Sequence, residues 1–159
     1  MITKDFVFLS QRFYDEYSAE LYPEIQRKTN RPYLVVIVEI RDITFAIPLR
    51  HHIMHRYSFI TNRTERWGLD YSKAVIISRP EFIEKPNRPI TINQSEYVKI
   101  TDRKKYIQSK FEQFLNTYER AVLRGTPLVE PVLQYSTLQY FHQELGLTHK
   151  LLLNRRNTD

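Results

Sequence analysis

The sequence predicts one α+β domain over residues 1–159, with a mainly antiparallel β-sheet and helices packed against it. Two β-branched runs, "YLVVIVEI" (33–40) and "ITFAIPL" (43–49), are separated by only two residues, as in a β-hairpin. A third apolar run, "AVIIS" (74–78), follows. After residue 101 the apolar residues recur at helical spacing instead. Strands followed by a long helix are the order typical of an α+β domain.

The remaining elements follow from local signals. Residues 1–10 predict a short strand, and "QRFYDEYSAELYPEI" (11–25) predicts a helix that ends at Pro23. A polar loop (27–32) leads to the hairpin, whose turn is Arg41-Asp42, although this pair is not a favoured two-residue turn. The proline-rich segment 79–89 is a connection, and "ITIN" and "YVKI" predict an edge strand or a turn.

Two helices are predicted in the last third of the chain. The first runs from about 101 to 124 and ends before Gly125 and Pro127. Its apolar residues are Ile107, Phe111, Phe114, Leu115, Tyr118 and Val122, which we assign to the core. We assign the cations of its other face to solvent rather than to RNA: Arg103, Lys104, Lys105, Lys110 and Arg120. The second helix begins at Ser136, with Gln139 as its capping-box partner, and ends at Gly146.

The composition favours an anionic partner. The chain carries 24 Lys and Arg against 18 Asp and Glu, a net charge of +6, and 13% aromatic residues. A basic, aromatic domain suits RNA, because unpaired bases stack on exposed rings. The absence of cysteine excludes disulfides, thiolate metal sites and a Cys nucleophile. The longest apolar run (33–38) is too short to cross a bilayer, and the N-terminus has no signal-peptide pattern, so we expect a cytoplasmic protein.

The segment 47–77 concentrates the residues that can carry chemistry. It holds three histidines, His51, His52 and His55, in an expected irregular stretch between two apolar strands. Cations and rings alternate after them: Arg56, Tyr57, Phe59, Arg63, Arg66, Trp67, Tyr71 and Lys73. Three histidines could serve zinc, but no HExxH pattern is present and the neighbouring cations would repel a divalent ion. We therefore expect neither a metal nor another cofactor.

Proton transfer to and from RNA suits this segment better. The RNA 2′-OH can attack the adjacent phosphorus, which requires a base, an acid and fixed positive charge. His51 or His52, together with Arg50 and Lys73, could supply these groups. If the strand continued to residue 52, the two histidines would point to opposite faces; both could act if the chain turned after Leu49. A solvated histidine-rich loop and a non-catalytic RNA-binding surface are the alternatives.

The order of these segments resembles a known family. "VVIVEIRDITFAIPL", "RHHIMHRYSF" and "GLDYSKAVII" resemble, over residues 33–78 and more loosely 101–124, the toxins of type III toxin–antitoxin systems. The similarity is to the TenpN branch of the family that also includes ToxN, CptN and AbiQ. It implies a metal-independent endoribonuclease that leaves a 2′,3′-cyclic phosphate, on a compact, strongly curved sheet like that of Kid and MazF, flanked by helices. It also implies inhibition by a repeat-derived pseudoknot RNA antitoxin, closed toxin–RNA assemblies, cellular or phage RNA substrates, and roles in growth inhibition and phage defence.

The resemblance transfers residues only in part. In the ToxN branch Pro-Leu is followed by Thr-Ser-x-Lys, which carries the catalytic hydroxyl and ammonium. Here Leu49 is followed by Arg50-His51-His52-Ile53, so His51 stands at the Ser and Ile53 at the Lys. Lys73 is the expected substitute cation, with a structural lysine at a strand start as the alternative, and the adjacent Ser72 is a further catalytic candidate. The expected RNA contacts are Arg56, Tyr57, Arg63, Arg66, Trp67 and Tyr71.

Overall fold

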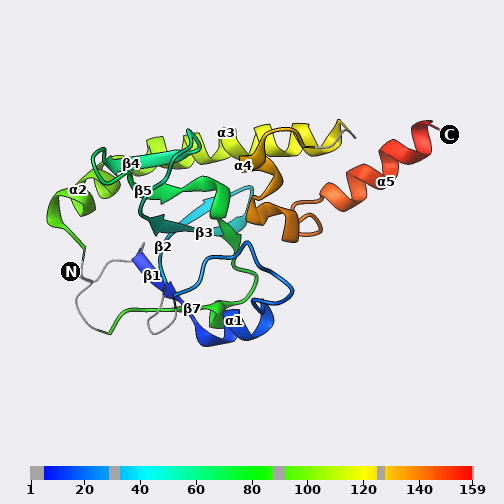
Figure 1. The fold of residues 1–159 in the computed structure, drawn as a ribbon. Helices are drawn as coiled ribbons and strands as arrows, with labels where there is room; N and C mark the ends of the chain where they lie inside the picture. Colours follow the sequence, from blue (N-terminus) through cyan, green and yellow to red (C-terminus); the bar gives the residue numbers. More distant parts are fainter. Residues whose placement is uncertain (1–5, 29–32, 88–91, 125–127, 159) are drawn as a thin grey trace.

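The computed structural model describes residues 6–28, 33–87, 92–124 and 128–158, which form an antiparallel sheet with helices around it (Figure 1). The strands are β1 (Phe6–Leu9), β2 (Leu34–Ile40), β3 (Ile43–Arg50), β4 (Ser58–Asn62), β5 (Trp67–Asp70), β6 (Val75–Ile76) and β7 (Ile83–Glu84). The helices are α1 (Gln11–Glu16), α2 (Gln94–Asp102), α3 (Lys104–Leu123), α4 (Pro131–Gln134) and α5 (Leu147–Thr158), with 3₁₀ turns η1 (Tyr71–Lys73), η2 (Pro80–Phe82) and η3 (Thr137–Tyr140). Every described strand pairing is antiparallel, which confirms the α+β prediction.

The β2–β3 hairpin forms as predicted and lies at the centre of the sheet. Its strands pair from Val35↔Pro48 to Ile40↔Ile43. Arg41 and Asp42 have φ angles of 56° and 62°, as a two-residue turn of type I′ requires. The Arg41 guanidinium donates to Glu119 Oε1 and to Asn116 Oδ1 on α3, both at 2.5 Å. These contacts offset an unfavourable turn sequence and fix the hairpin to the helix.

Helix α3 supplies one wall of the core. Its predicted apolar face is buried except for Val122, which is partly buried. Phe111 packs edge-on against Phe45 of β3 with ring centroids 5.0 Å apart. The helix begins only at Lys104, because the chain bends at Arg103 after α2 ends. The predicted stop at residues 125–127 lies outside the described residues. No described helix has the length and apolar character needed to span a membrane.

The N-terminal helix is shorter than predicted. It ends at Glu16, and the following residues form turns down to Ile25. The rings of Tyr17 and Tyr22 pack edge-on at 5.0 Å. Residues five positions apart do not lie on one face of a helix, so this contact requires the turn.

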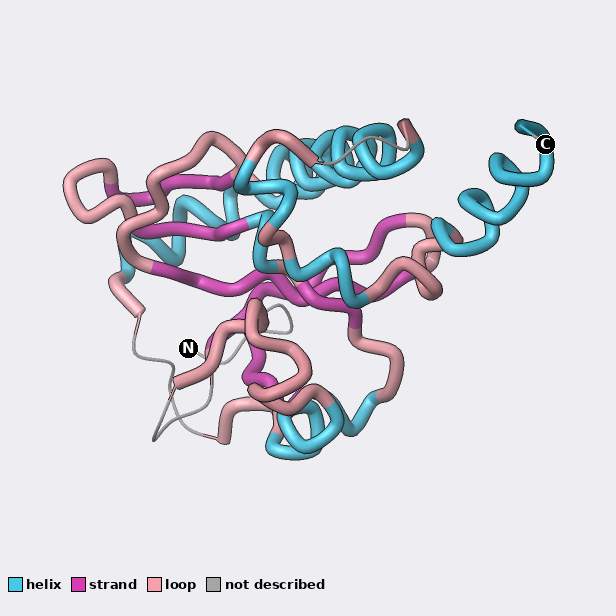
Figure 2. The backbone as a smooth tube through the Cα atoms, turned by 45° about the vertical axis from the view of Figure 1, so that its right-hand side comes forward, coloured by secondary structure: helices cyan, strands magenta, loops and turns pink. Residues whose placement is uncertain are grey.

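Two other predicted elements are wrong. Residues 94–102 form α2, not an edge strand, because Asn93 caps a helix by accepting from the Ser95 N–H; residues 90–91 lie outside the described part. The helix predicted from Ser136 to Gly146 is absent. Ser136 caps only the short turn η3, and Gln139 donates to the Ser136 carbonyl rather than forming a capping box. Gly146, at φ 74°, reverses the chain and α5 begins after it, extending away from the sheet in both ribbon and tube views (Figures 1 and 2).

The sheet is open and not strongly curled, contrary to expectation (Figure 2). The strand order is β4-β5-β3-β2-β1-β7, with β6 beside β3. One edge of β3 is shared by two short strands: β6 pairs with Phe45–Ala46 and β5 with Leu49–Arg50. The turn η1 separates these strands, so the edge is broken rather than bent into a closed barrel.

The segment 47–77 is more regular than predicted, because β4 and β5 form a hairpin inside it. Gly68 of β5 permits this pairing. A Cβ at Gly68 would lie 2.0 Å from the Phe59 carbonyl oxygen and 2.9 Å from the Ile60 Cα, both backbone atoms of β4. Only glycine allows the two strands to approach so closely.

We expect Gly68→Ala to destabilise the protein by about 3 kcal/mol, since the strands must separate. Gly146→Ala is the matched comparison. Nothing lies within 4 Å of its added Cβ, so only the left-handed φ opposes it, at about 1 kcal/mol. Chemical denaturation of both variants measures the difference. Equal losses would contradict the close-approach explanation.

Candidate functional site

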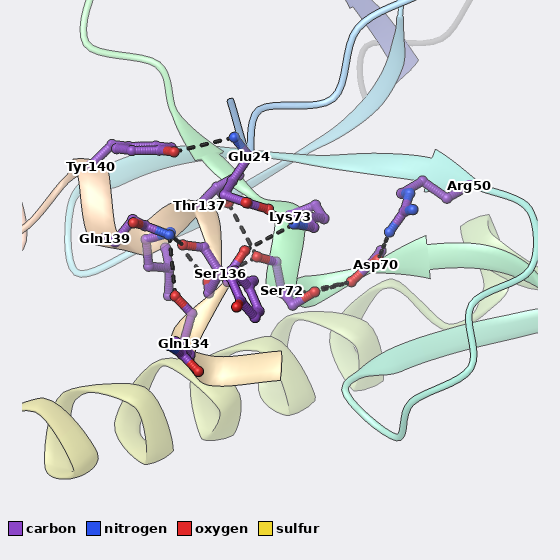
Figure 3. Close-up of polar contacts among 12 residues, drawn as sticks. Glu24, Arg50, Asp70, Ser72, Lys73, Gln134, Ser136, Thr137, Gln139 and Tyr140 are labelled. Carbon is purple, nitrogen blue, oxygen red and sulfur yellow. Dashed lines mark hydrogen bonds and ion pairs between the residues drawn. The ribbon is translucent and has the colours of Figure 1, made fainter. Parts of the chain in front are cut away.

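A buried carboxylate lies at the end of β5. Asp70 is fully buried, and its Oδ1 accepts hydrogen bonds from the Ser72 N–H (3.0 Å) and the Ser72 hydroxyl (2.6 Å). Nε2 of His55 lies 3.1 Å from the same oxygen, and the Arg50 guanidinium binds Oδ2. Figure 3 shows Arg50, Asp70 and Ser72 in this arrangement. One carboxylate thus joins β3, the loop after it, β5 and η1.

The cluster keeps Asp70 ionised. Burial alone would raise its pKa, but hydrogen bonds from His55 and Ser72, and the positive charges of His55 and Arg50, outweigh it, so the pKa is lowered. Arg50 also neighbours Tyr33, whose pKa burial raises to about 12. The ionised carboxylate therefore holds the Arg50 guanidinium at the end of β3.

His55 acts within the cluster as a structural donor. Its Nδ1 accepts from the Tyr57 backbone N–H at 3.1 Å. The other ring nitrogen, Nε2, faces Asp70 Oδ1 and the Ser72 hydroxyl (3.3 Å). Both ring nitrogens are engaged by protein groups in this arrangement.

His51 and His52 lie on the surface just outside the cluster. β3 ends at Arg50 and the chain turns, with His52 at φ 57° and its N–H bonded to the Glu65 carbonyl (3.2 Å). The two histidines are therefore not on opposite faces of a continued strand; both are exposed, with ring centroids 6.3 Å apart. Ile53, at the position of the ToxN-branch lysine, is buried.

Ser72, which belongs to the cluster, and the adjacent Lys73 are both held by residues of other segments (Figure 3). Lys73 Nζ donates to Glu24 Oε2 (2.8 Å) and to the Tyr135 carbonyl (2.9 Å), and its side chain is 13% exposed. The buried Ser72 carbonyl accepts from the Ser136 hydroxyl (2.8 Å). The structure therefore gives Lys73 an ion-pair partner instead of an open position toward a phosphate.

A groove of about 720 Å³ runs between residues 55–60 and the first half of α3. It is lined by His55, Arg56, Tyr57, Ser58, Phe59, Ile60, Arg66, Tyr71, Arg103, Tyr106, Lys110, Gln113, Phe114 and Thr117. Four of the six predicted RNA contacts lie here: Arg56, Tyr57, Arg66 and Tyr71. Of the other two, Arg63 lines a separate depression with Lys99, and Trp67 packs beside His51 at 5.9 Å.

Sequence reasoning missed two parts of this site. Asp70 was overlooked, although an acid in an apolar strand, two residues before a serine, is a recognisable capping signal. The cations Arg103 and Lys110 were assigned to solvent, yet they face the groove. Among the described residues, no group of three or more His, Asp or Glu side chains is placed to hold a metal ion.

Comparison with known proteins gives one structural likeness to report. No family model and no curated protein matches the sequence. The chain is similar to a solved structure described as "A processed non-coding RNA regulates a bacterial antiviral system", with a TM-score of 0.54 and 18% identity. The match covers 79% of this chain and 90% of that chain. At this identity the likeness shows a shared fold.

We expect Asp70→Asn to cost about 3 kcal/mol of stability, because Arg50 would lose its buried anionic partner. The lowered pKa of Asp70 also determines how the stability of the protein depends on pH. The Asp70 contribution is complete above the unfolded pKa, about 3.9, and is lost as the pH falls toward the lower folded value. The variant should therefore lose less stability than the wild type on acidification below about pH 4.

Denaturation midpoints across that pH range test the expectation. Asp42→Asn is the matched control, because it makes the same change at an exposed turn residue. If the two variants have the same stability and pH profile, the buried cluster contributes no net stability.

Proposed function

We propose that this protein is an endoribonuclease toxin of a type III toxin–antitoxin system, silenced by an RNA antitoxin. The observation that carries the proposal is the groove beside β4, which gathers four cations and three tyrosines next to the Asp70 cluster. Binding of single-stranded RNA requires cations along the phosphate backbone and aromatic rings on which the bases stack. The shared fold supports this, because the similar structure is described as a bacterial antiviral system that a processed non-coding RNA regulates.

The proposed reaction needs no metal. The 2′-oxygen attacks the adjacent phosphorus, the 5′-oxygen leaves, and a 2′,3′-cyclic phosphate remains. Either His51 or His52 takes the 2′-proton, and the other protonates the leaving oxygen. Arg50, oriented by Asp70, stabilises the charge of the phosphorane. Ser72 and Lys73 act indirectly, since their contacts position Asp70 and η1.

RNA binding is assigned to the groove and its surroundings. Arg66 is pre-oriented, because its Nε donates to the Ile53 carbonyl at 2.9 Å. Arg56 and Tyr57 lie at the same wall, whereas Arg63 and Trp67 extend the basic surface beyond it. A pseudoknot antitoxin would occupy the same surface as the substrate, in the cytoplasm, and each RNA repeat could bridge toxins into a closed assembly.

A non-catalytic RNA-binding protein is the second candidate, and one observation favours it. His55 is the one histidine among the groove-lining residues, and both its nitrogens are engaged by protein groups. Under this alternative the groove binds phosphates and bases, and no proton is transferred.

Cleavage in excess EDTA separates the two candidates. The proposal predicts that purified protein cuts RNA there and leaves cyclic-phosphate ends, and that induction arrests growth. His51→Ala or His52→Ala should slow single-turnover cleavage by about 100- to 10,000-fold, with little change in RNA affinity. Binding without cleavage in the wild type would support the non-catalytic candidate, and cleavage that EDTA abolishes would reject the metal-free reaction.

Salt dependence tests the groove. Arg66→Ala should weaken RNA binding and reduce the slope of log affinity against log salt by about one unit, since one phosphate contact is lost. Arg120→Ala removes the same charge from the exposed side of α3, outside the groove-lining residues, and should leave the slope unchanged. Fluorescence anisotropy at several salt concentrations measures both. Equal effects would place the RNA elsewhere.

A further inference from the structure

The α3 wall of the groove carries an aromatic residue that the proposed reaction does not use. Tyr106 is 44% exposed, and the Arg103 guanidinium carbon lies 4.5 Å from the centre of its ring. Lys110 Nζ is 5.6 Å from the same centre, and Phe59 of β4 packs beside the ring at 6.2 Å. Tyr106 is thus half-exposed and lies between two cations, each about one helical turn away.

A second, independent feature lies in the same groove. Tyr71 is 3% exposed, and its hydroxyl is buried without a hydrogen-bond partner among the described residues. Tyr71 and Tyr106 both line the groove, and they are close enough to interact electrostatically: burial first, and Tyr106 second, raise the pKa of Tyr71. A buried hydroxyl without a partner costs free energy in the folded protein, so a ligand atom that pairs with it gains the recovered hydrogen bond.

We infer that Tyr106 and Tyr71 form a nucleobase subsite on α3, in which a single-stranded RNA base stacks on Tyr106 and its polar edge pairs with the Tyr71 hydroxyl. Arg103 and Lys110 hold the phosphates on either side of that base. The inference rests on the proposed RNA-binding function and adds to it a place where one base, rather than the backbone, is read.

The chemistry of each group matches this role. Bases stack on tyrosine rings, and the Tyr106 ring is half-exposed at the groove wall. The Tyr71 hydroxyl is buried in the free protein, so the edge of the stacked base reaches it only after the side chains that cover it shift. The tyrosine hydroxyl can donate or accept a hydrogen bond. The preference among bases therefore depends on where their donors and acceptors lie and not on charge.

The test uses the full-length protein and short 2′-O-methyl oligoribonucleotides, which cannot be cleaved, each with one base removed at a chosen position. Anisotropy at one fixed salt concentration gives the affinities. We expect one abasic position to weaken wild-type binding by about 10- to 100-fold. Tyr106→Ala should weaken binding of the intact oligonucleotide by a similar factor. The two losses should not add when variant and abasic RNA are combined, because each removes the same stack.

Tyr135→Ala is the matched control, since Tyr135 is 53% exposed and does not line the groove. It should bind like the wild type. Tyr71→Phe should reduce the preference among bases at the sensitive position while stability stays equal or rises, as expected when an unpaired hydroxyl is removed. A purely structural Tyr71 would leave base preference unchanged.

The outcomes separate the two proposals. If the wild type binds RNA but Tyr106→Ala behaves like Tyr135→Ala, or if the variant and abasic losses add, the subsite is rejected and the RNA-binding proposal stands. If the wild type binds no RNA, both fail. Thermal denaturation of each variant identifies any loss of affinity that comes from unfolding.

Discussion

The site depends on one buried anion. Asp70 has no exposed surface, so its charge must be balanced by groups from other segments, and it receives them from Arg50, His55 and Ser72. An uncompensated buried carboxylate would cost several kcal/mol, so each partner is forced into a fixed position. This requirement fixes Arg50 at the end of β3 and draws the His55 loop against β5. The same contacts cap η1, whose turn divides β5 from β6 and leaves the sheet open.

A second set of hydrogen bonds stabilises this cluster. The segment from Tyr135 to Tyr140 follows α3 by more than ten residues, yet it binds the turn after Asp70 at several points. The hydroxyls of Ser136 and Thr137 bind the Ser72 carbonyl, at 2.8 and 3.2 Å. Lys73 adds its contacts to Glu24 and to the Tyr135 carbonyl. Because the two bonds to the Ser72 carbonyl are buried, they hold the turn that carries Ser72 in place, as a preorganised site requires.

Sequence reasoning succeeded where the signal is local. The β2–β3 hairpin and α3 were predicted because alternation and helical spacing follow from each segment alone. The β4–β5 hairpin was not, because its pairing depends on the close approach that Gly68 permits. The last helix was misplaced because Ser136 caps a turn that binds Ser72, a contact 64 residues away in sequence. The Asp70 cluster was missed for the same reason. No local pattern marks its members as a cluster, because they come together only when three segments of the chain meet.

The positive charge of the chain divides into two classes. Arg41, Arg50 and Lys73 each have a carboxylate partner, and each joins elements of the fold. Arg66, Arg103 and Lys110 line the groove and form no ion pair with a carboxylate of the described residues. Exposed cations gathered without counter-ions repel one another, at a cost that folding alone does not explain. A polyanion removes that repulsion on binding, so the groove is the part of this surface where RNA binding gains the most free energy.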